Sequence, residues 1–296
     1  MNPLRPQLLK DVVGQDDIKQ RLRISIDAAL SRGEALPHTL ADGAPGLGKT
    51  TLACAIANEL GVGIQIANGA NLRSVKSLLP YIARVKERDV LFIDEIHRCG
   101  IITQEFLYPI MEDFKCCIGE ESKMSMELPK FTLIGATTEG GMLAAPLYDR
   151  FLLKYYLELY SVENLSRLVA MTARKLSVDI SAPGCRQIAQ ASRGTPRIAN
   201  SRLMWVRDYA TSEGLQSVSD SVVQAAFALE GVDANGMDRN DRVYLQALRR
   251  AGSAMGLKSL VAATNISQDT IENTIEPFLL RQGLIRKTPK GRVLCG

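Results

Sequence analysis

The sequence lacks long apolar runs, and no stretch approaches the roughly 18 consecutive apolar residues that a membrane-spanning helix needs. Its first residues, MNPLRPQLLK, lack the charged and then apolar pattern of a secretory signal. Histidine is scarce, with 2 residues, and the 6 cysteines form no Cys-x-x-Cys pair, which argues against a zinc site or a disulfide framework. We therefore expect a cytosolic protein with reduced thiols and no membrane association.

Acidic residues are missing from the end of the sequence, where none follows Glu276. Five basic residues lie in the same stretch: Arg281, Arg286, Lys287, Lys290 and Arg292. The formal net charge of +4 is by itself too small to indicate nucleic-acid binding. The distribution of charge is more informative, because it predicts that any surface for DNA lies at the C-terminal end.

Short apolar runs alternate with helical stretches up to about residue 160. The strand-like runs are HTLAD, VGIQIANG, DVLFIDE, FTLIGATT and KYYLELY, at residues 38–42, 62–69, 89–95, 131–138 and 154–160. Between the first two, Leu52, Ile56 and Leu60 share one face of a predicted helix. This rhythm is typical of an α/β fold in which helices cover both faces of a mostly parallel sheet.

The strand pattern ends near Ser161, and helical periodicity continues to about Glu230. GVDANG, residues 231–236, has the composition of a linker. Beyond it, three short helical patterns precede GLIRKTPKGRVL, which predicts two strands around a turn, as in a winged helix. At 296 residues the chain accommodates three domains, which we place at 1–160, 161–232 and 233–296.

GAPGLGKT, residues 43–50, matches the phosphate-binding P-loop and lies between a predicted strand and a predicted helix. Its glycines let the backbone N–H groups wrap a phosphate, toward which the helix also directs its positive dipole end. We expect Lys49 to reach the β and γ phosphates, Thr50 to bind Mg²⁺, and Thr51 to lie beside the α-phosphate. The pattern alone also fits an ordinary glycine-rich turn, so it needs support from elsewhere in the chain.

DVLFIDE supplies that support, because two adjacent carboxylates at the end of an apolar strand have no packing explanation. We expect Asp94 to hold the metal and Glu95 to polarise the attacking water. The alternative is a strand that simply ends in a polar loop. His97 follows closely, and we assign it no role.

FTLIGATT is another apolar strand that ends in polar residues. We expect Thr137, with Thr138 as second choice, to sense the γ-phosphate or the attacking water. The ordinary preference of threonine for strands explains the pattern equally well.

The order of seven motifs makes the pattern specific: GAPGLGKT, VLFIDEIHR, LYPIMEDF, FTLIGATT, PLYDRF, SRGTPRIAN and TPKGR. Together they resemble the RuvB family of AAA+ motors, which drive branch migration of Holliday junctions, and the resemblance runs along nearly the whole chain. It implies an AAA+ P-loop domain with a parallel sheet, a helical lid domain and a C-terminal winged-helix domain.

The resemblance also implies further contacts to ATP. The nucleotide-binding residues implied by matching motif positions, beyond Lys49, Thr50 and Thr51, are Leu4, Arg5, Gly46, Leu47, Gly48, Glu112, Asp113, Phe114, Tyr160 and Arg197. Leu4 and Arg5 match a segment beside the base, and Tyr160 matches a contact at the start of the lid. Arg197 matches the sensor 2 arginine, which couples lid position to nucleotide state, although the residue could otherwise lie on the surface.

Arg150, in PLYDRF, resembles the arginine finger that reaches the γ-phosphate of the neighbouring subunit. Such a finger contributes ~10³ to 10⁵ in rate. Without the resemblance, a surface arginine at the end of a strand is the simpler interpretation. An arginine that acts in trans requires an oligomer, and the family implies a hexameric ring around duplex DNA.

Lys287 and Arg292 match basic residues of the family that contact DNA, although a solvated basic hairpin is the simpler alternative. Contacts of this kind bind phosphates rather than bases, so we expect binding that is independent of sequence and sensitive to salt. The family also implies a junction-binding partner, RuvA, which docks on a hairpin at residues 115–130. That segment is shorter here than in the family, which puts the partnership in question.

Other departures leave the predicted ATPase residues untouched. Ala44 replaces the usual proline of the P-loop, Glu139 and Tyr148 replace common arginines, and Trp205 lies in a segment that has lost basic residues. We therefore expect an ATP hydrolase that moves Holliday junction DNA. The alternative is a nucleotide-switched DNA-binding or loader protein without strand-moving activity.

Overall fold

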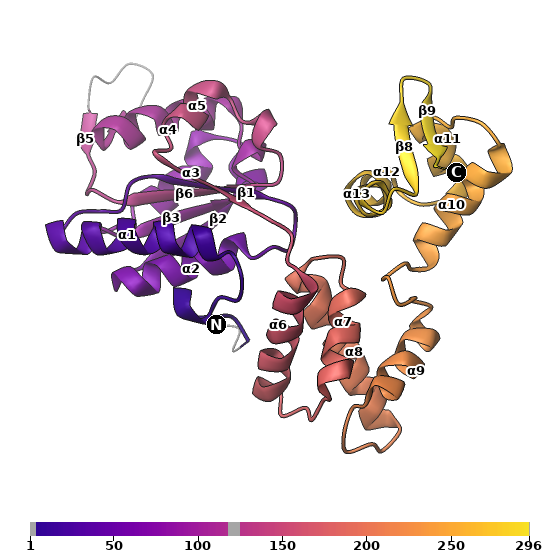
Figure 1. The fold of residues 1–296 in the computed structure, drawn as a ribbon. Coiled ribbons are helices and arrows are strands. Elements are labelled where there is room, and N and C mark those ends of the chain that lie inside the picture. The colour runs from indigo at the N-terminus through magenta and orange to yellow at the C-terminus, as the bar shows by residue number, and fades with distance from the viewer. Residues whose placement is uncertain (1–3, 118–124, 296) are drawn as a thin grey trace. The chain divides into compact units, whose positions relative to one another are not determined.

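The computed structural model describes residues 4–117 and 125–295 (Figure 1). The chain forms two compact units. The first comprises residues 1–164 together with 195–197, and the second comprises residues 165–194 and 198–296.

A five-stranded parallel sheet forms the centre of the first unit. Its strands are β1 (Thr39–Gly43), β2 (Ile64–Asn68), β3 (Val90–Asp94), β6 (Thr132–Thr137) and β7 (Leu153–Leu157). Their order is β2-β3-β6-β1-β7, and every neighbouring pair is parallel. We call the side where these strands begin the amino edge and the side where they end the carboxyl edge. The predicted α/β sheet is confirmed.

Each face of the sheet buries a separate apolar cluster, because successive side chains of a strand point to opposite faces. One face packs against α1 (Asp16–Arg32) and α2 (Lys49–Leu60), and the other against α3 (Val75–Ile82), α4 (Ile101–Asp113) and α5 (Ala145–Asp149). In β3, Phe92 belongs to the first cluster while Leu91 and Ile93 belong to the second. Burial on both faces explains why the strands have continuous apolar runs.

A small antiparallel hairpin follows α4 and consists of β4 (Lys115–Cys117) and β5 (Ser125–Glu127). This is the segment in which the sequence predicted a partner-docking hairpin. Its tip, residues 118–124, lies outside the described residues. Among the helices of the described ranges, none is both long and apolar enough to span a bilayer.

The second unit contains a helical part and a smaller part with a two-stranded sheet. The helices are α6 (Val162–Lys175), whose first turn belongs to the first unit, α7 (Ala182–Gln190), α8 (Pro196–Ser212) and α9 (Asp220–Glu230). The smaller part contains α10 (Arg239–Ala251), α11 (Leu257–Thr264), α12 (Gln268–Thr270), a π-helical turn (Ile271–Ile275), α13 (Glu276–Arg281), β8 (Ile285–Thr288) and β9 (Gly291–Leu294). Its core includes Tyr244, Leu260 and Phe278. Helices followed by the antiparallel β8–β9 hairpin are the elements that the sequence predicted for a winged helix, and the prediction is confirmed.

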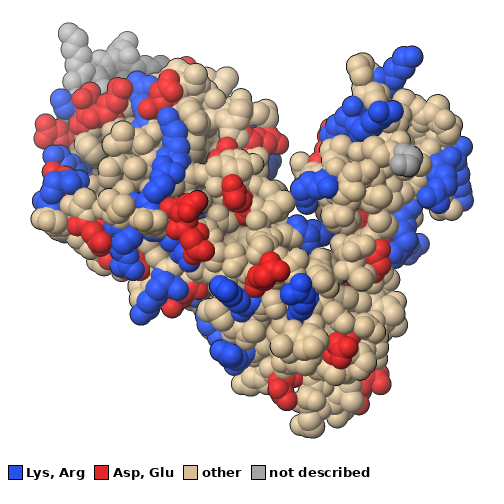
Figure 2. Space-filling view, in the orientation of Figure 1, with Lys and Arg blue, Asp and Glu red and all other residues tan. Residues whose placement is uncertain are grey.

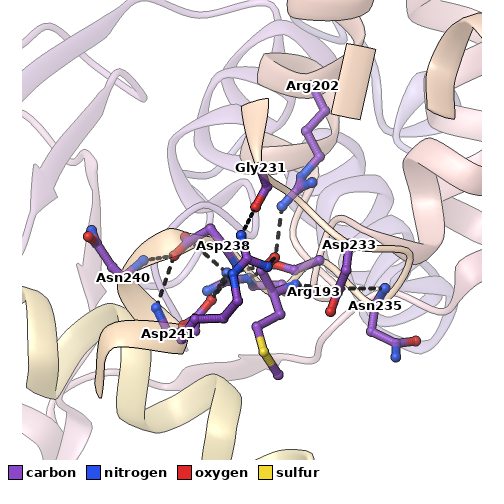
Figure 3. Close-up of polar contacts among 11 residues, drawn as sticks. Arg193, Arg202, Gly231, Asp233, Asn235, Asp238, Asn240 and Asp241 are labelled. Atoms are coloured by element: carbon purple, nitrogen blue, oxygen red, sulfur yellow. Dashed lines mark hydrogen bonds and ion pairs between the residues drawn. The ribbon is translucent and has the colours of Figure 1, made fainter. Parts of the chain in front are cut away.

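Arg193, in the loop between α7 and α8, connects the two parts of the second unit (Figure 3). Its guanidinium donates to Asp241 at 2.5 Å, to Asp238 at 3.1 Å and to the carbonyl oxygen of Gly236, and it lies 4.1 Å from the ring centre of Phe278. Only 5% of the Arg193 side chain is exposed, and the Asp241 side chain is fully buried. Such a pair holds the first turn of α10 against the helical part.

Candidate nucleotide site and DNA-binding surface

The P-loop follows β1 at the carboxyl edge and has the backbone that a phosphate cradle requires. Gly46 and Gly48 have φ angles of 81° and 103°, in the left-handed region that favours glycine. Gly48 caps α2 without a side-chain hydrogen bond. The first N–H groups of the helix therefore remain available for an anion, so this loop fits the phosphates of a nucleotide.

Lys49 is buried beside this loop, with its residue 7% exposed. Its ammonium group donates to the carbonyl oxygens of Gly43 at 2.6 Å and Ala44 at 3.3 Å. Burial lowers the pKa of Lys49, while the nearby carboxylates of Glu95 and Asp94 act in the opposite direction. The structure thus brings the P-loop lysine and the two predicted acids into one electrostatic cluster.

Asp94 ends β3 at the carboxyl edge, and Glu95 follows it. Burial and the adjacent charge of Glu95 raise the pKa of Asp94, and the charge of Lys49 lowers it. Thr50, in the first turn of α2, adds a hydroxyl at the same edge. Carboxylate and hydroxyl oxygens are hard ligands, and Mg²⁺ needs only one or two of them from a protein when phosphates supply others. The donor set fits Mg²⁺.

Glu95 has a left-handed backbone with a φ of 49°, which is uncommon for a residue that has a side chain. Its carboxylate accepts hydrogen bonds from the backbone N–H of Thr138 at 3.2 Å and from the Thr138 hydroxyl at 2.9 Å. The same carboxylate lies 3.4 Å from Nδ1 of His97. The end of β6 therefore holds the acid that we expect to activate water.

Thr137 ends β6 and is fully buried. Its hydroxyl accepts the backbone N–H of Glu139 at 3.0 Å and lies 2.9 Å from Nδ1 of His97. In the sheet register, Thr137 is paired with Asp42, one residue before the P-loop begins. The sensor candidate thus lies at the same edge as the P-loop.

Arg197 lies close to the P-loop, although most of α8 belongs to the second unit. Its backbone N–H points at the carbonyl oxygen of Gly46 at 3.4 Å. A Cβ added to Gly46 would lie 2.8 Å from Thr195 and 3.0 Å from Arg197. The positive charge of Arg197 also lowers the pKa of Asp94, but by less than the charge of Lys49 does.

The N-terminal segment lies along α2, the helix that follows the P-loop. Arg5 donates to the sulfur of Cys54 at 3.8 Å, and Asn58 donates to the carbonyl oxygen of Gln7 at 2.9 Å. Leu4 precedes this contact in the chain. Tyr160 packs against the core cluster beneath the same helix, and burial raises the pKa of its hydroxyl to about 12.

Glu112, Asp113, Phe114 and Arg150 lie apart from the residues above, at the amino edge of the sheet. The ring of Phe114 packs against His38 and Phe131, which precede β1 and β6. Asp113 is exposed. Since a five-residue strand spans about 16 Å, these residues do not share a pocket with the P-loop of their own subunit.

Arg150 forms an ion pair with Glu112 at 3.0 Å, and its guanidinium lies 4.4 Å from the ring centre of Tyr108. It also donates to the carbonyl oxygen of Pro146 at 2.6 Å. The side chain remains 23% exposed. Arg150 is therefore held in a defined position at a surface remote from Lys49 along the strands.

The two predicted DNA contacts share a partner inside the winged helix. Glu276 is fully buried, and its carboxylate pairs with Lys287 at 2.7 Å and with Arg292 at 2.7 Å. Burial alone would raise the pKa of Glu276, but the hydrogen bonds from Arg292 and Lys287 lower it. Lys287 is 49% exposed, whereas Arg292 is 15% exposed. Lys287 is thus the more accessible of the two.

The winged-helix segment has an excess of positive charge, with 10 Lys and Arg against 5 Asp and Glu in residues 234–295. Figure 2 shows basic side chains over this part of the molecule, with few acidic ones on the visible face. The exposed basic residues are Arg239, Arg242, Arg249, Arg250, Lys258, Arg281, Arg286, Lys287 and Lys290. The surface fits a polyanion.

Three family models cover the chain from residue 4 to residue 295 almost without a gap. The Holliday junction DNA helicase RuvB P-loop domain matches residues 4–157, the RuvB AAA lid domain matches residues 160–233, and the RuvB C-terminal winged helix domain matches residues 234–295. The chain belongs to the RuvB family.

Relatives of known name support this membership. A Holliday junction branch migration complex subunit RuvB from Rhodopirellula baltica is 47% identical, with 98% of this chain and 81% of the relative covered. One from Parasynechococcus marenigrum is 46% identical, with 98% and 86% covered. The solved RuvB Holliday junction branch migration motor of Thermotoga maritima matches with a TM-score of 0.89 and 36% identity, covering 99% of this chain and 96% of that one. The RuvB fold predicted from the sequence is confirmed.

Sequence reasoning missed the roles of His97, Glu276 and Arg193 in this RuvB-family chain. His97 lies between the two strand ends that hold Glu95 and Thr137. The sequence did indicate that His97 lies near the site, because it follows Asp94 by only three residues. Glu276 and Arg193 gave no signal, because their importance depends on partners that only the folded chain brings to them.

Proposed function

We propose that this chain is an ATP-hydrolysing motor that drives branch migration of Holliday junctions in recombination and repair, as a hexameric ring on duplex DNA. One observation carries the proposal: the candidate ATPase residues lie at opposite edges of the sheet. Lys49, Asp94, Glu95 and Thr137 are at the carboxyl edge, whereas Arg150 is at the amino edge. One subunit alone therefore lacks a complete site.

Residues of the carboxyl edge would bind the nucleotide. The backbone of Gly46, Leu47 and Gly48 would wrap the phosphates, Lys49 would neutralise their charge, and Thr51 would contact the α-phosphate. Thr50 and Asp94 would hold Mg²⁺, which would neutralise charge on the phosphates, while bound ATP would supply the electrophilic γ-phosphorus. The buried position of Lys49 beside Asp94 supports this arrangement.

Glu95 would accept a hydrogen bond from the attacking water and orient it, and Thr137 would detect the γ-phosphate through its hydroxyl. Both act at the end of a rigid strand, which favours precise positioning. Leu4, Arg5 and Tyr160 would enclose the base, since the N-terminal segment follows α2 closely. Arg197 would couple loss of the γ-phosphate to movement of the lid.

Arg150, with Glu112, Asp113 and Phe114 beside it, would complete the site of the next subunit. Large apolar side chains are exposed at both edges of the sheet, as an interface between two different edges requires. Leu152 is 75% exposed near the amino edge, and Ile101 and Met142 are 75% and 69% exposed near the carboxyl edge. A head-to-tail contact of this kind forms a ring when the rotation between successive subunits closes on itself, which is the arrangement proposed here.

The winged helix would hold DNA through phosphates. Lys287 and the exposed basic residues beside it supply the charge, and Arg292 would contribute mainly by holding the wing on Glu276. The β4–β5 hairpin is the proposed docking element for a RuvA-type junction-binding protein.

Branch migration of synthetic four-way junctions, with and without RuvA, tests the proposal. The wild-type chain should separate the arms with ATP and Mg²⁺, and Lys49→Ala should abolish both movement and hydrolysis. Undiminished DNA-stimulated hydrolysis by Lys49→Ala would refute the assignment. ATP-dependent junction binding without strand movement by the wild type would favour a nucleotide-switched binding or loader protein instead.

A further inference from the structure

The imidazole of His97 lies between the ends of β3 and β6, with only 8% of its side chain exposed. Nδ1 lies 2.9 Å from the hydroxyl oxygen of Thr137 and 3.4 Å from a carboxylate oxygen of Glu95. On the other side of the ring, Nε2 lies 3.7 Å from a carboxylate oxygen of Glu139. A single ring thus contacts both the water-activating candidate and the sensor candidate.

The hydroxyl of Thr137 has one proton to donate and two lone pairs that can accept. The backbone N–H of Glu139 uses one lone pair, at 3.0 Å. The contact with Nδ1 of His97 can then form in two ways. If Nδ1 lacks a proton, Thr137 donates to it and its only proton is used. If Nδ1 carries a proton, Thr137 accepts from it and keeps its own proton for another group.

The neighbours of His97 favour a proton on Nδ1. An ionised carboxylate can only accept hydrogen bonds, and the carboxylate of Glu95 lies on the Nδ1 side of the ring. The carboxylate of Glu95 lies nearer to the ring than that of Glu139, at 3.4 Å against 3.7 Å. Its side chain is also less exposed, at 24% against 46% for Glu139. A bare Nδ1 would accept the hydroxyl proton of Thr137, but its lone pair would also face the negative charge of this carboxylate at 3.4 Å, whereas an N–H at Nδ1 is attracted to both oxygens.

We propose that His97 carries a proton on Nδ1 and is a positioning residue, which acts by keeping the hydroxyl proton of Thr137 free to donate to a phosphate oxygen or to the attacking water. With both lone pairs of Thr137 occupied, its hydroxyl is limited to the role of donor. The inference rests on the proposed sensor function of Thr137. It adds the reason why a buried threonine can act as a donor toward the nucleotide.

His38 provides an internal comparison, because the chain has 2 histidines and both are largely buried. The backbone N–H of Leu133 donates to Nδ1 of His38 at 2.9 Å, and Nε2 lies 3.1 Å from the carbonyl oxygen of Met111. These partners require the proton to be on Nε2. The partners of His38 are backbone groups of the core, whereas those of His97 are side chains of the candidate site.

Nitrogen NMR of the full chain labelled with ¹⁵N-histidine tests the proton position directly, without nucleotide. The 2 histidines give separate signals, which His97→Asn and His38→Gln assign. His38 should show a protonated Nε2 and a bare Nδ1. His97 should show a protonated Nδ1, in either its neutral or its doubly protonated form. A bare Nδ1 in His97 would overturn the proposal.

Turnover tests whether the proton matters. Asparagine places an amide N–H near the position of Nδ1, whereas glutamine places it near Nε2, so His97→Asn should retain most of kcat. His97→Gln should lower kcat about tenfold, the effect of one lost hydrogen bond in the transition state, with KM for ATP unchanged. Equal kcat for the two variants would contradict the proposal.

A double-mutant cycle with Thr137→Val separates this inference from the proposed function. If His97 acts through Thr137, His97→Gln should cause no further loss in the Thr137→Val background. Full turnover by Thr137→Val would remove the sensor role itself, whereas the NMR result concerns only the proton on His97. Additive losses would show that His97 acts by another route and would overturn the inference.

Discussion

Arg150 and Glu112 form an ion pair of 3.0 Å at the amino edge of the sheet, at the opposite end of the strands from Lys49. The pair fixes the direction of a guanidinium that remains partly exposed. Because the pair lies so far from the P-loop of its own subunit, any role of Arg150 in ATP hydrolysis must be exerted on another subunit. The arrangement explains in geometric terms why the chain would work as an oligomer.

Arg150→Ala should lower ATP turnover by about 10³ while nucleotide affinity stays near that of the wild type. The reason is that Arg150 would stabilise charge in the transition state of the neighbouring site rather than bind the nucleotide of its own. Steady-state hydrolysis and binding of a fluorescent ADP analogue measure the two effects. Arg84→Ala, an exposed arginine in the same unit, is the matched control. Unchanged turnover in Arg150→Ala would rule out the finger.

Lys287→Ala should weaken binding to duplex and junction DNA, since one phosphate contact is lost. The slope of the logarithm of the binding constant against the logarithm of salt concentration should fall in magnitude by about 1. Arg292→Ala should instead destabilise the wing, because the buried carboxylate of Glu276 loses a partner. Fluorescence anisotropy over a salt series measures the slope. Lys76→Ala, on the P-loop domain, should leave it unchanged. An unaltered slope in Lys287→Ala would place the DNA contact elsewhere.

Arg193→Met should lower the free energy of unfolding of the second unit by about 3–5 kcal/mol, because it leaves the buried carboxylate of Asp241 unpaired. Trp205, the only tryptophan, lies in α8 and reports on this unit in urea unfolding. Arg207→Met removes an arginine whose partner Asp208 is 60% exposed, and it should change the free energy by no more than about 0.5 kcal/mol. Equal stability of both variants would refute the structural role of Arg193.

The stability of the first unit should fall in mild acid because of His38. Burial lowers its pKa from 6.5 to about 4, so between these values the unfolded chain binds a proton that the folded chain excludes. The contribution is complete above pH 6.5 and is lost as the pH falls toward 4, by about 3 kcal/mol in total. Hydrogen exchange of the Leu133 amide, corrected for intrinsic rates, measures it. His38→Gln should be less stable at neutral pH but should lack this pH dependence.

The strands and the P-loop could be predicted from the sequence because their signals are local. DVLFIDE is apolar because β3 is buried on both faces, and the two acids at its end have no packing role. The same holds for the glycines at 46 and 48, whose backbone angles follow from the loop itself.

The remaining features depend on partners that are distant in sequence. The sequence placed Phe114 near the nucleotide but gave no indication that it lies at the amino edge, which depends on how α4 runs back across the sheet. Arg292 looked like a free basic residue, yet its guanidinium is paired with Glu276, 16 positions earlier. Strand order is likewise a long-range property, and local periodicity does not encode it.

Mixing two inactive variants tests the central claim that the ATPase site is completed by a second subunit. Lys49→Ala lacks the P-loop lysine and Arg150→Ala lacks the finger, so each alone should fail to hydrolyse ATP. In a mixed ring, intact P-loops of Arg150→Ala subunits meet intact fingers of Lys49→Ala subunits, and DNA-stimulated hydrolysis should partly recover. Absence of recovery in mixtures shown to assemble together would contradict the account.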